Sequence, residues 1–221
     1  MGGHDGPGCA CAATRVRQTV LDLARRLSQG SFLRPTTCAT AALSVGVGFL
    51  PLSGMAAGLG PVATGAAVSV LAACAAIVQP RAGLALDTGR LTTRTGLGAG
   101  LLITAAGLAC AMLPGLAGVL LAAALIGTGT GVITPLGFAA LASDTPSERL
   151  GQTMGAAELG RELGDAGGPL LVGGIATAAT LTSGYAALAI ILAAVSLVLT
   201  RSGGAAEEQA DTDPRSGQSA T

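Results

Sequence analysis

The chain has 221 residues, of which 50% are apolar, 35 are glycine and only 11% are charged, and its formal net charge is +0. Soluble domains usually carry roughly 25% charged residues and about 7% glycine, so this composition argues against an ordinary soluble enzyme. It also excludes a disordered chain, a disulfide-rich secreted domain and a basic protein that binds nucleic acid. Together with a mean hydropathy of +0.65, these values indicate an all-α integral membrane protein.

The first predicted region, residues 1–33, precedes the apolar part of the chain and lacks the hydrophobic segment of a secretory signal peptide. Residues 15–27 carry spaced arginines and predict a short amphipathic helix, on the inner membrane surface or packed beneath the bundle. His4, Cys9 and Cys11 suggest a metal site or lipid attachment only weakly, because three such side chains on a terminal segment are not a convincing ligand set. We therefore predict no metal and no cofactor.

Three long stretches without charge follow, at residues 35–80, 95–143 and 166–200. A membrane-spanning helix needs about 20 apolar residues, and turns with glycine, proline or serine divide each stretch into two spans. The third stretch is short for two spans, so its first helix must also use residues before 166. Continuous apolar runs argue against barrel strands, which alternate in polarity.

These stretches predict a transmembrane bundle of six helices over residues 34–201. The predicted spans are residues 35–56, 60–80, 95–113, 117–142, 153–181 and 184–200.

The distribution of arginine predicts how the helices are oriented. The chain has no lysine, so arginine supplies all of its positive charge. The loops after the first, third and fifth spans carry no charge, whereas arginines lie around the other two loops, in the start of the fifth span and in both terminal segments. The positive-inside rule therefore predicts that both termini are cytoplasmic. We expect a disordered cytoplasmic tail over residues 202–221 and a multi-pass protein of the plasma membrane.

The charged loop after the second span contains a compact motif. Gly83, Asp87, Gly89 and Arg90 follow the pattern Gly-x-x-x-Asp-x-Gly-Arg and predict a tight turn between two helices. The glycines permit close backbone approach or a positive φ, Asp87 can lie against a helix N-terminus, and Arg90 can pair with a carboxylate. A generic charged loop that follows the positive-inside rule is the alternative from the spacing alone.

This motif resembles the loop signature of the major facilitator superfamily, which joins the second and third helices of a six-helix half and helps to latch its cytoplasmic side. A second pattern lies in the fifth predicted span. There Gly164, Gly168 and Pro169, followed by Gly173 and Gly174, are similar to the glycine–proline motif of antiporters in that family.

The resemblance implies a transporter built from two six-helix halves, each half formed by 3+3 inverted repeats, with the solute cavity between the halves. The chain looks like one half. Its arginine-bearing lead resembles the central linker of the family, so the C-terminal half is the better match. Such a half requires a second six-helix half or a homodimer partner to enclose a cavity, and a truncated remnant is the alternative.

The start of the fifth span carries an unusual stripe of charge. Glu158, Arg161, Glu162 and Asp165 are spaced so that they share one helical face. Two carboxylates of like charge, partly removed from water, raise a carboxyl pKa, as proton coupling requires. The alternatives are a wetted cytoplasmic mouth held by ion pairs, contact with a cationic solute, and contact with the missing half.

Small residues recur on the same helix. Gly160, Gly164 and Gly168 form a small-xxx-small series, which permits close packing of helices in lipid. A hinge at Gly167 to Pro169 is the alternative interpretation.

Taken together, these features predict a secondary active transporter, or half of one, that moves a small organic solute by proton-coupled efflux. The predicted partners are the lipid bilayer, the solute, protons and a second half or homodimer partner, but not nucleic acid. We do not expect an enzyme, because the spans contain no nucleophile paired with a base. The alternative function is a non-transporting subunit, or truncated half-transporter, that only binds a partner half.

Overall fold

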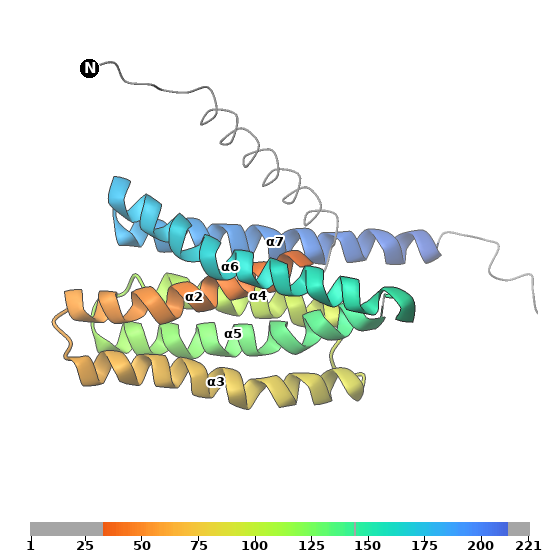
Figure 1. Cartoon of the computed structure of the whole chain (residues 1–221), viewed down its shortest axis with the longest axis horizontal. Helices are drawn as coiled ribbons and strands as arrows, with labels where there is room; N and C mark the ends of the chain where they lie inside the picture. The colour runs from red at the N-terminus through yellow and green to blue at the C-terminus, as the bar shows by residue number, and fades with distance from the viewer. Residues whose placement is uncertain (1–32, 144, 212–221) are drawn as a thin grey trace, which may run out of the picture.

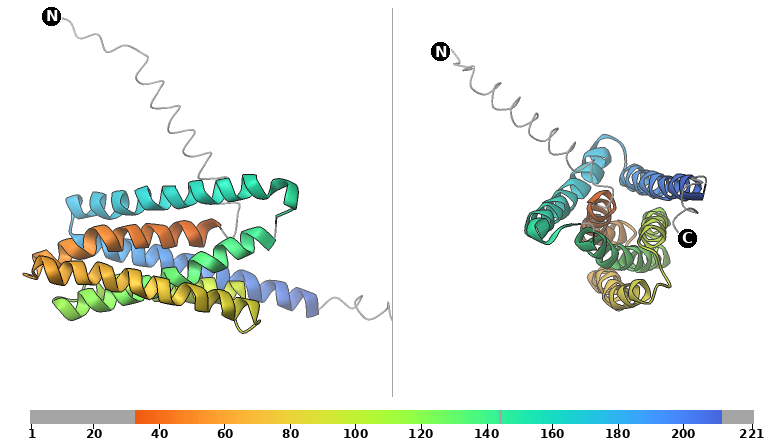
Figure 2. Two further views of the ribbon diagram at one scale, coloured as in Figure 1. Left: turned by 60° about the horizontal axis from the view of Figure 1, so that its bottom comes forward. Right: turned by 90° about the vertical axis from the view of Figure 1, so that its right-hand side faces the viewer.

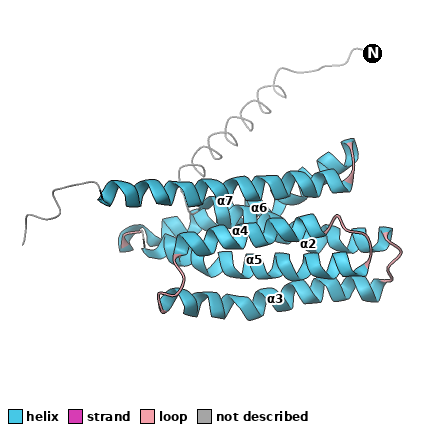
Figure 3. Ribbon diagram, turned by 180° about the vertical axis from the view of Figure 1, so that it is seen from behind, coloured by secondary structure: helices cyan, strands magenta, loops and turns pink. Residues whose placement is uncertain are grey.

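The computed structural model describes residues 33–143 and 145–211, which form a bundle of long helices and contain no strand (Figures 1 and 3). The predicted all-α fold class is thereby confirmed. The helices are α2 (Leu33–Ala56), α3 (Pro61–Asp87), α4 (Thr93–Cys110), α5 (Leu116–Ser143), α6 (Leu150–Ala178) and α7 (Leu181–Asp211), with a 3-10 helix, η1 (Ser147–Arg149), before α6. The amphipathic helix predicted at residues 15–27 and the side chains of His4, Cys9 and Cys11 lie outside the described residues.

Each predicted span corresponds to one long helix, but the helices differ in their ability to cross a membrane. By length and composition, α2, α3, α5 and α7 are sufficiently long and apolar. The helix α4 has only 18 residues, about 27 Å, and Arg94 near its start lowers its hydropathy. The helix α6 carries four charged residues between Glu158 and Asp165. The structure thus supports four candidate spans directly and leaves two helices that are more polar.

Two helices extend well beyond their predicted ends, and the other helix ends differ from the prediction by three residues or fewer. The helix α3 continues past residue 80 to Asp87 although Pro80 lies inside it, and the side chain of Arg81 donates to the carbonyl of Ile77 at 2.7 Å in the turn that the proline disturbs. The helix α7 continues to Asp211, so residues 202–211 are helical instead of disordered as predicted. Residues 205–210 consist of alanine, glutamate and glutamine, which are strong helix formers.

The helices α2 and α5 form the centre of the bundle. The helix α2 packs mainly against α6, α5 and α3, while α5 packs against α4, α3 and α2, and α7 covers α4 and α6. Figure 2 shows α6 and α3 on opposite sides of the α2–α5 pair, with α4 and α7 covering another side of it. Val45, Leu101, Ile126 and Leu136 are fully buried in this centre, where apolar burial supplies the packing.

The two ends of the bundle differ in charge. The turns between α2 and α3, α4 and α5, and α6 and α7 lie at one end and carry no charged residue, while the arginine-bearing connections lie at the other end (Figure 1). Gly58 and Gly115, with φ of 79° and 88°, allow tight uncharged turns. The helices therefore alternate in direction along the chain.

Candidate functional site

One arginine on α6 contacts three carboxylates. Nη2 of Arg161 lies 2.6 Å from Oε1 of Glu158 and 2.8 Å from Oε1 of Glu162, and Nη1 lies 3.4 Å from Oδ2 of Asp165. Nε of Arg161 also donates to Oε1 of Glu158 at 3.0 Å. The spacing along one helical face produces this arrangement. We call these four residues the Arg161 cluster, and their charges sum to −2.

The guanidinium of Arg161 lies between the two glutamates, so it offsets the repulsion that the sequence predicts for carboxylates four residues apart. The cluster stays open to solvent, because the side chains of Glu158 and Glu162 are 53% and 61% exposed. Asp165 is less exposed, at 35%, and lies furthest along α6 from the charged end of the bundle. Ion pairs this exposed contribute little to stability, so the cluster is a charged surface feature and not a core contact.

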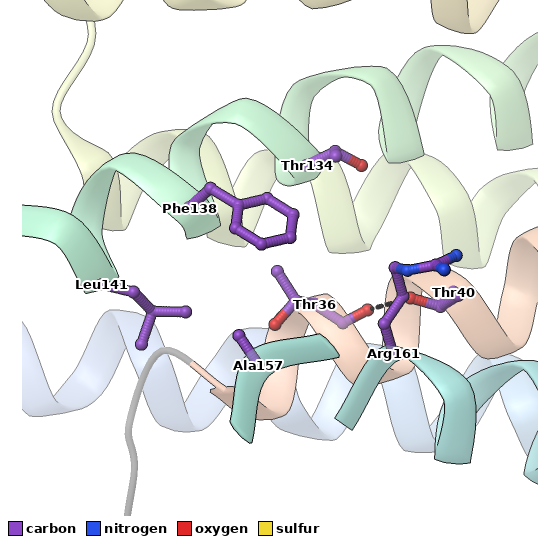
Figure 4. Close-up of a pocket in the computed structure, with 7 residues that line it drawn as sticks. All are labelled: Thr36, Thr40, Thr134, Phe138, Leu141, Ala157 and Arg161. Carbon is purple, nitrogen blue, oxygen red and sulfur yellow. Dashed lines mark hydrogen bonds between the residues drawn. The ribbon is translucent and has the colours of Figure 1, made fainter. Parts of the chain in front are cut away.

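Arg161 also borders a small cavity between α2, α5 and α6 (Figure 4). The cavity has a volume of about 20 Å³, which is room for roughly one water molecule. The hydroxyl of Thr40 donates to the carbonyl of Thr36 at 2.7 Å on its α2 side. Its lining residues are Thr36, Thr40, Thr134, Phe138, Leu141, Ala157 and Arg161. An organic solute does not fit into this space within the described part of the chain.

A larger pocket lies at the opposite, uncharged end of the bundle. Its volume is about 240 Å³, and it is bordered by the ends of α2 and α7 and by the turn between α4 and α5. The hydroxyls of Ser53 and Tyr185 lie 2.8 Å apart in its wall and link α2 to α7. No charged residue borders this pocket in the described chain, so it is chemically unlike the Arg161 cluster.

The loop motif is partly helical. Gly83 and Asp87 belong to α3, and only Gly89 and Arg90 lie in the turn that follows, so the predicted turn at 83–90 is shorter than expected. Gly89 ends the helix with a φ of 68°, which favours glycine. Neither Asp87 nor Arg90 forms an ion pair with another described residue. Because α3 and α6 flank the α2–α5 pair on opposite sides (Figure 2), the motif does not meet the Arg161 cluster within the chain.

The glycine series on α6 faces α2. Gly160, Gly164 and Gly168 are buried. A Cβ atom added at Gly164 would collide with the carbonyl oxygen of Thr37, and one added at Gly168 would collide with that of Ala41. The absence of side chains at these positions lets the two helix backbones touch.

The carbonyl that the proline of the same motif leaves free has a hydrogen-bond donor on α2, which the sequence did not predict. Pro169 lies inside α6 and has no N–H to donate to the carbonyl of Asp165. The hydroxyl of Ser44, on α2, donates to this carbonyl at 3.0 Å. Further along α6, a Cβ at Gly173 would lie 3.5 Å from the Phe49 ring, and one at Gly174 would meet nothing. The proline inside this predicted span indicates a freed carbonyl, but it does not indicate which residue donates to that carbonyl.

Apolar helices of membrane length, with arginine-bearing loops at one end of the bundle, define a multi-pass helical membrane protein. The sequence profile of the Major Facilitator Superfamily matches residues 36–218. The chain belongs to the major facilitator superfamily, and the predicted family is confirmed. It therefore carries a transporter domain, and members of this family are transporters rather than enzymes. No curated protein matches the chain.

Proposed function

We propose that the chain forms a six-helix half of a secondary active transporter, which exports a small organic solute in exchange for protons by alternating access. The Arg161 cluster carries this proposal. Three carboxylates share one guanidinium within 3.4 Å, so a proton or a cationic solute can replace a contact of Arg161 without leaving a carboxylate unpaired. Ionisable groups on a helix of a membrane bundle are functional candidates.

The proposed membrane topology has six spans with both termini in the cytoplasm. Although α4 and α6 are the more polar helices, both run alongside the four apolar ones (Figure 1), and no charged residue follows Asp165, near the middle of α6. The proposed 3+3 repeats make α2–α4 and α5–α7 equivalent units. The contact of α2 with α6 then corresponds to that of α5 with α3, and both are extensive, whereas α4 packs extensively on α5, and α7 packs only slightly on α2.

A solute pathway requires a second six-helix half, because the cavity beside Arg161 holds only about one water molecule. The second half is either another copy of the chain or a separate sequence, and lipid surrounds the assembly. The same small cavity also favours the alternative function, a subunit that binds a partner half without transporting solute itself.

Reconstituted transport tests the proposal. In proteoliposomes that hold the assembled protein, an imposed pH gradient should drive movement of fluorescent organic cations, with ethidium as the first probe. Glu158→Gln and Glu162→Gln should each lower the rate by about tenfold or more, because a neutral amide cannot exchange a proton.

Glu148→Gln is the matched control, because Glu148 is an exposed carboxylate at the same end of the bundle and lies outside the cluster. Its transport rate should match that of the parent protein. Rates that stay unchanged in both cluster variants would remove the coupling role. A strict six-helix monomer, established by mass in detergent, would exclude a transporter made of two halves.

A further inference from the structure

Four helices of the bundle contain an internal proline, and at one of these prolines a side chain of another helix supplies a hydrogen-bond donor. Each proline frees the carbonyl four residues before it, since it has no N–H. The prolines are Pro51, Pro80, Pro135 and Pro169. The freed carbonyls belong to Val47, Ala76, Gly131 and Asp165. Of these four carbonyls, only that of Asp165 accepts a hydrogen bond from a side chain of another helix within the described part of the chain, the 3.0 Å bond from Ser44.

The glycines of α6 make this bond possible. Gly164 and Gly168 bring the α6 backbone against the α2 backbone at Thr37 and Ala41. A serine side chain is short, so Ser44 reaches a carbonyl on the facing helix only because the two backbones touch. A carbonyl without a partner inside a membrane bundle is costly, and a hydroxyl from a neighbouring helix is one of the few groups that can satisfy it there.

The same residue connects this bond to the Arg161 cluster. Asp165 accepts from Ser44 through its backbone carbonyl and from Arg161 through Oδ2 of its side chain. The bond from Ser44 therefore fixes the turn of α6 that carries the least exposed carboxylate of the cluster.

We infer that Ser44 is a positioning residue, which replaces the donor that Pro169 lacks and thereby holds Asp165 in place within the Arg161 cluster. The inference rests on the proposed function only for its consequence in transport. Apart from transport, the inference predicts an energetic coupling between Ser44 and Pro169, two residues that do not bond to each other.

A double-mutant cycle tests this coupling. Ser44→Ala in the full chain should lower the melting temperature in detergent by roughly 2–4 °C, because it leaves the carbonyl of Asp165 without its donor. Pro169→Ala restores an N–H that can donate to the same carbonyl. In the Pro169→Ala background, Ser44→Ala should therefore change the melting temperature by less than about 1 °C.

Ser196→Ala is the matched control. The hydroxyl of Ser196 donates to the carbonyl of Gly98 on α4 at 2.9 Å, and residue 102, which follows Gly98 by one helical turn, is a leucine with its own N–H. Ser196→Ala should therefore lower the melting temperature by the same amount in the parent chain and in the Pro169→Ala background. Equal losses for Ser44→Ala in both backgrounds would overturn the inference.

If Pro169→Ala does not fold, two further variants test whether the hydroxyl at position 44 stabilises the bundle. Ser44→Thr keeps a hydroxyl and Ser44→Val does not, while the two side chains have nearly the same shape. The threonine variant should melt roughly 2–4 °C above the valine variant, and equal melting temperatures would overturn the inference.

Transport measures the positioning role separately. In proteoliposomes, Ser44→Ala should lower pH-driven ethidium transport about tenfold, and Ser44→Thr should retain it within about twofold. Full transport by Ser44→Ala would refute the positioning role. If even the parent assembly moves no solute, the proposed function fails, and the melting temperatures still decide whether Ser44 and Pro169 are coupled.

Discussion

Replacing Gly168 by leucine should lower the melting temperature of the bundle by roughly 6–12 °C or prevent its folding. The substitution forces a side chain into the backbone of α2 at Ala41, and the carbonyl it meets cannot rotate away as a flexible side chain can. Overpacking costs about 1–3 kcal/mol and occasionally more, and because this collision is with backbone the upper value applies, which converts to that temperature range for a chain of this size. The measurement is thermal unfolding in detergent.

Gly167→Leu is the control for this variant, because it makes the same chemical change on the neighbouring position of α6. A Cβ atom at Gly167 meets nothing within 4 Å, so the control should melt within about 2 °C of the parent protein. Equal melting temperatures for the two variants would show that α2 and α6 do not pack through this glycine.

Arg161→Gln should reduce pH-driven transport by at least about tenfold while changing the melting temperature by less than about 2 °C. The three carboxylates of the cluster lose the one cation that they share. Stability should change little, because the arginine side chain is 39% exposed and exposed ion pairs are screened by water. Transport and melting temperature are measured on the same preparation.

Two further variants serve as comparisons for Arg161→Gln: Arg161→Lys keeps the charge, and Arg149→Gln removes a charge outside the cluster. A lysine keeps the charge but lacks the planar fork that reaches several carboxylates, so its transport should be intermediate. Arg149 is exposed in η1 and forms no ion pair with a described residue, so Arg149→Gln should transport normally. If Arg161→Gln transports as well as Arg149→Gln, the cluster has no part in the mechanism.

The sequence predicts the helices well because lipid restricts what a spanning segment can contain. Runs without charge place all six long helices, and the turns with Gly58 and Gly115 separate them. Helix ends are less predictable. Gly83 and Asp87 read as parts of a turn, yet both are helical, because a helix can continue through such residues until a residue such as Gly89 adopts a positive φ.

The candidate site is only partly visible in the sequence. The spacing of Glu158, Arg161, Glu162 and Asp165 on one helical face follows from helix periodicity, and the structure places their charged groups together. The contribution of Ser44 depends on α2 packing against α6, which is a contact between distant parts of the chain. Local patterns contain no information about such a pairing, so this part of the site requires the three-dimensional structure.

Cysteine labelling in intact cells tests most directly the claim that the chain crosses the membrane six times with its charged loops inside. In a variant without its five native cysteines, single cysteines replace exposed residues in the connections or, for Thr182, in the first turn of α7: Ala57, Thr88, Leu113, Ser147 and Thr182. A maleimide that cannot cross membranes should label the cysteines at 57, 113 and 182 and should spare those at 88 and 147. Protection at 113 would show that α4 does not cross the membrane, and labelling of both 113 and 147 from outside would show that α5 does not. Either result would contradict the six-span topology.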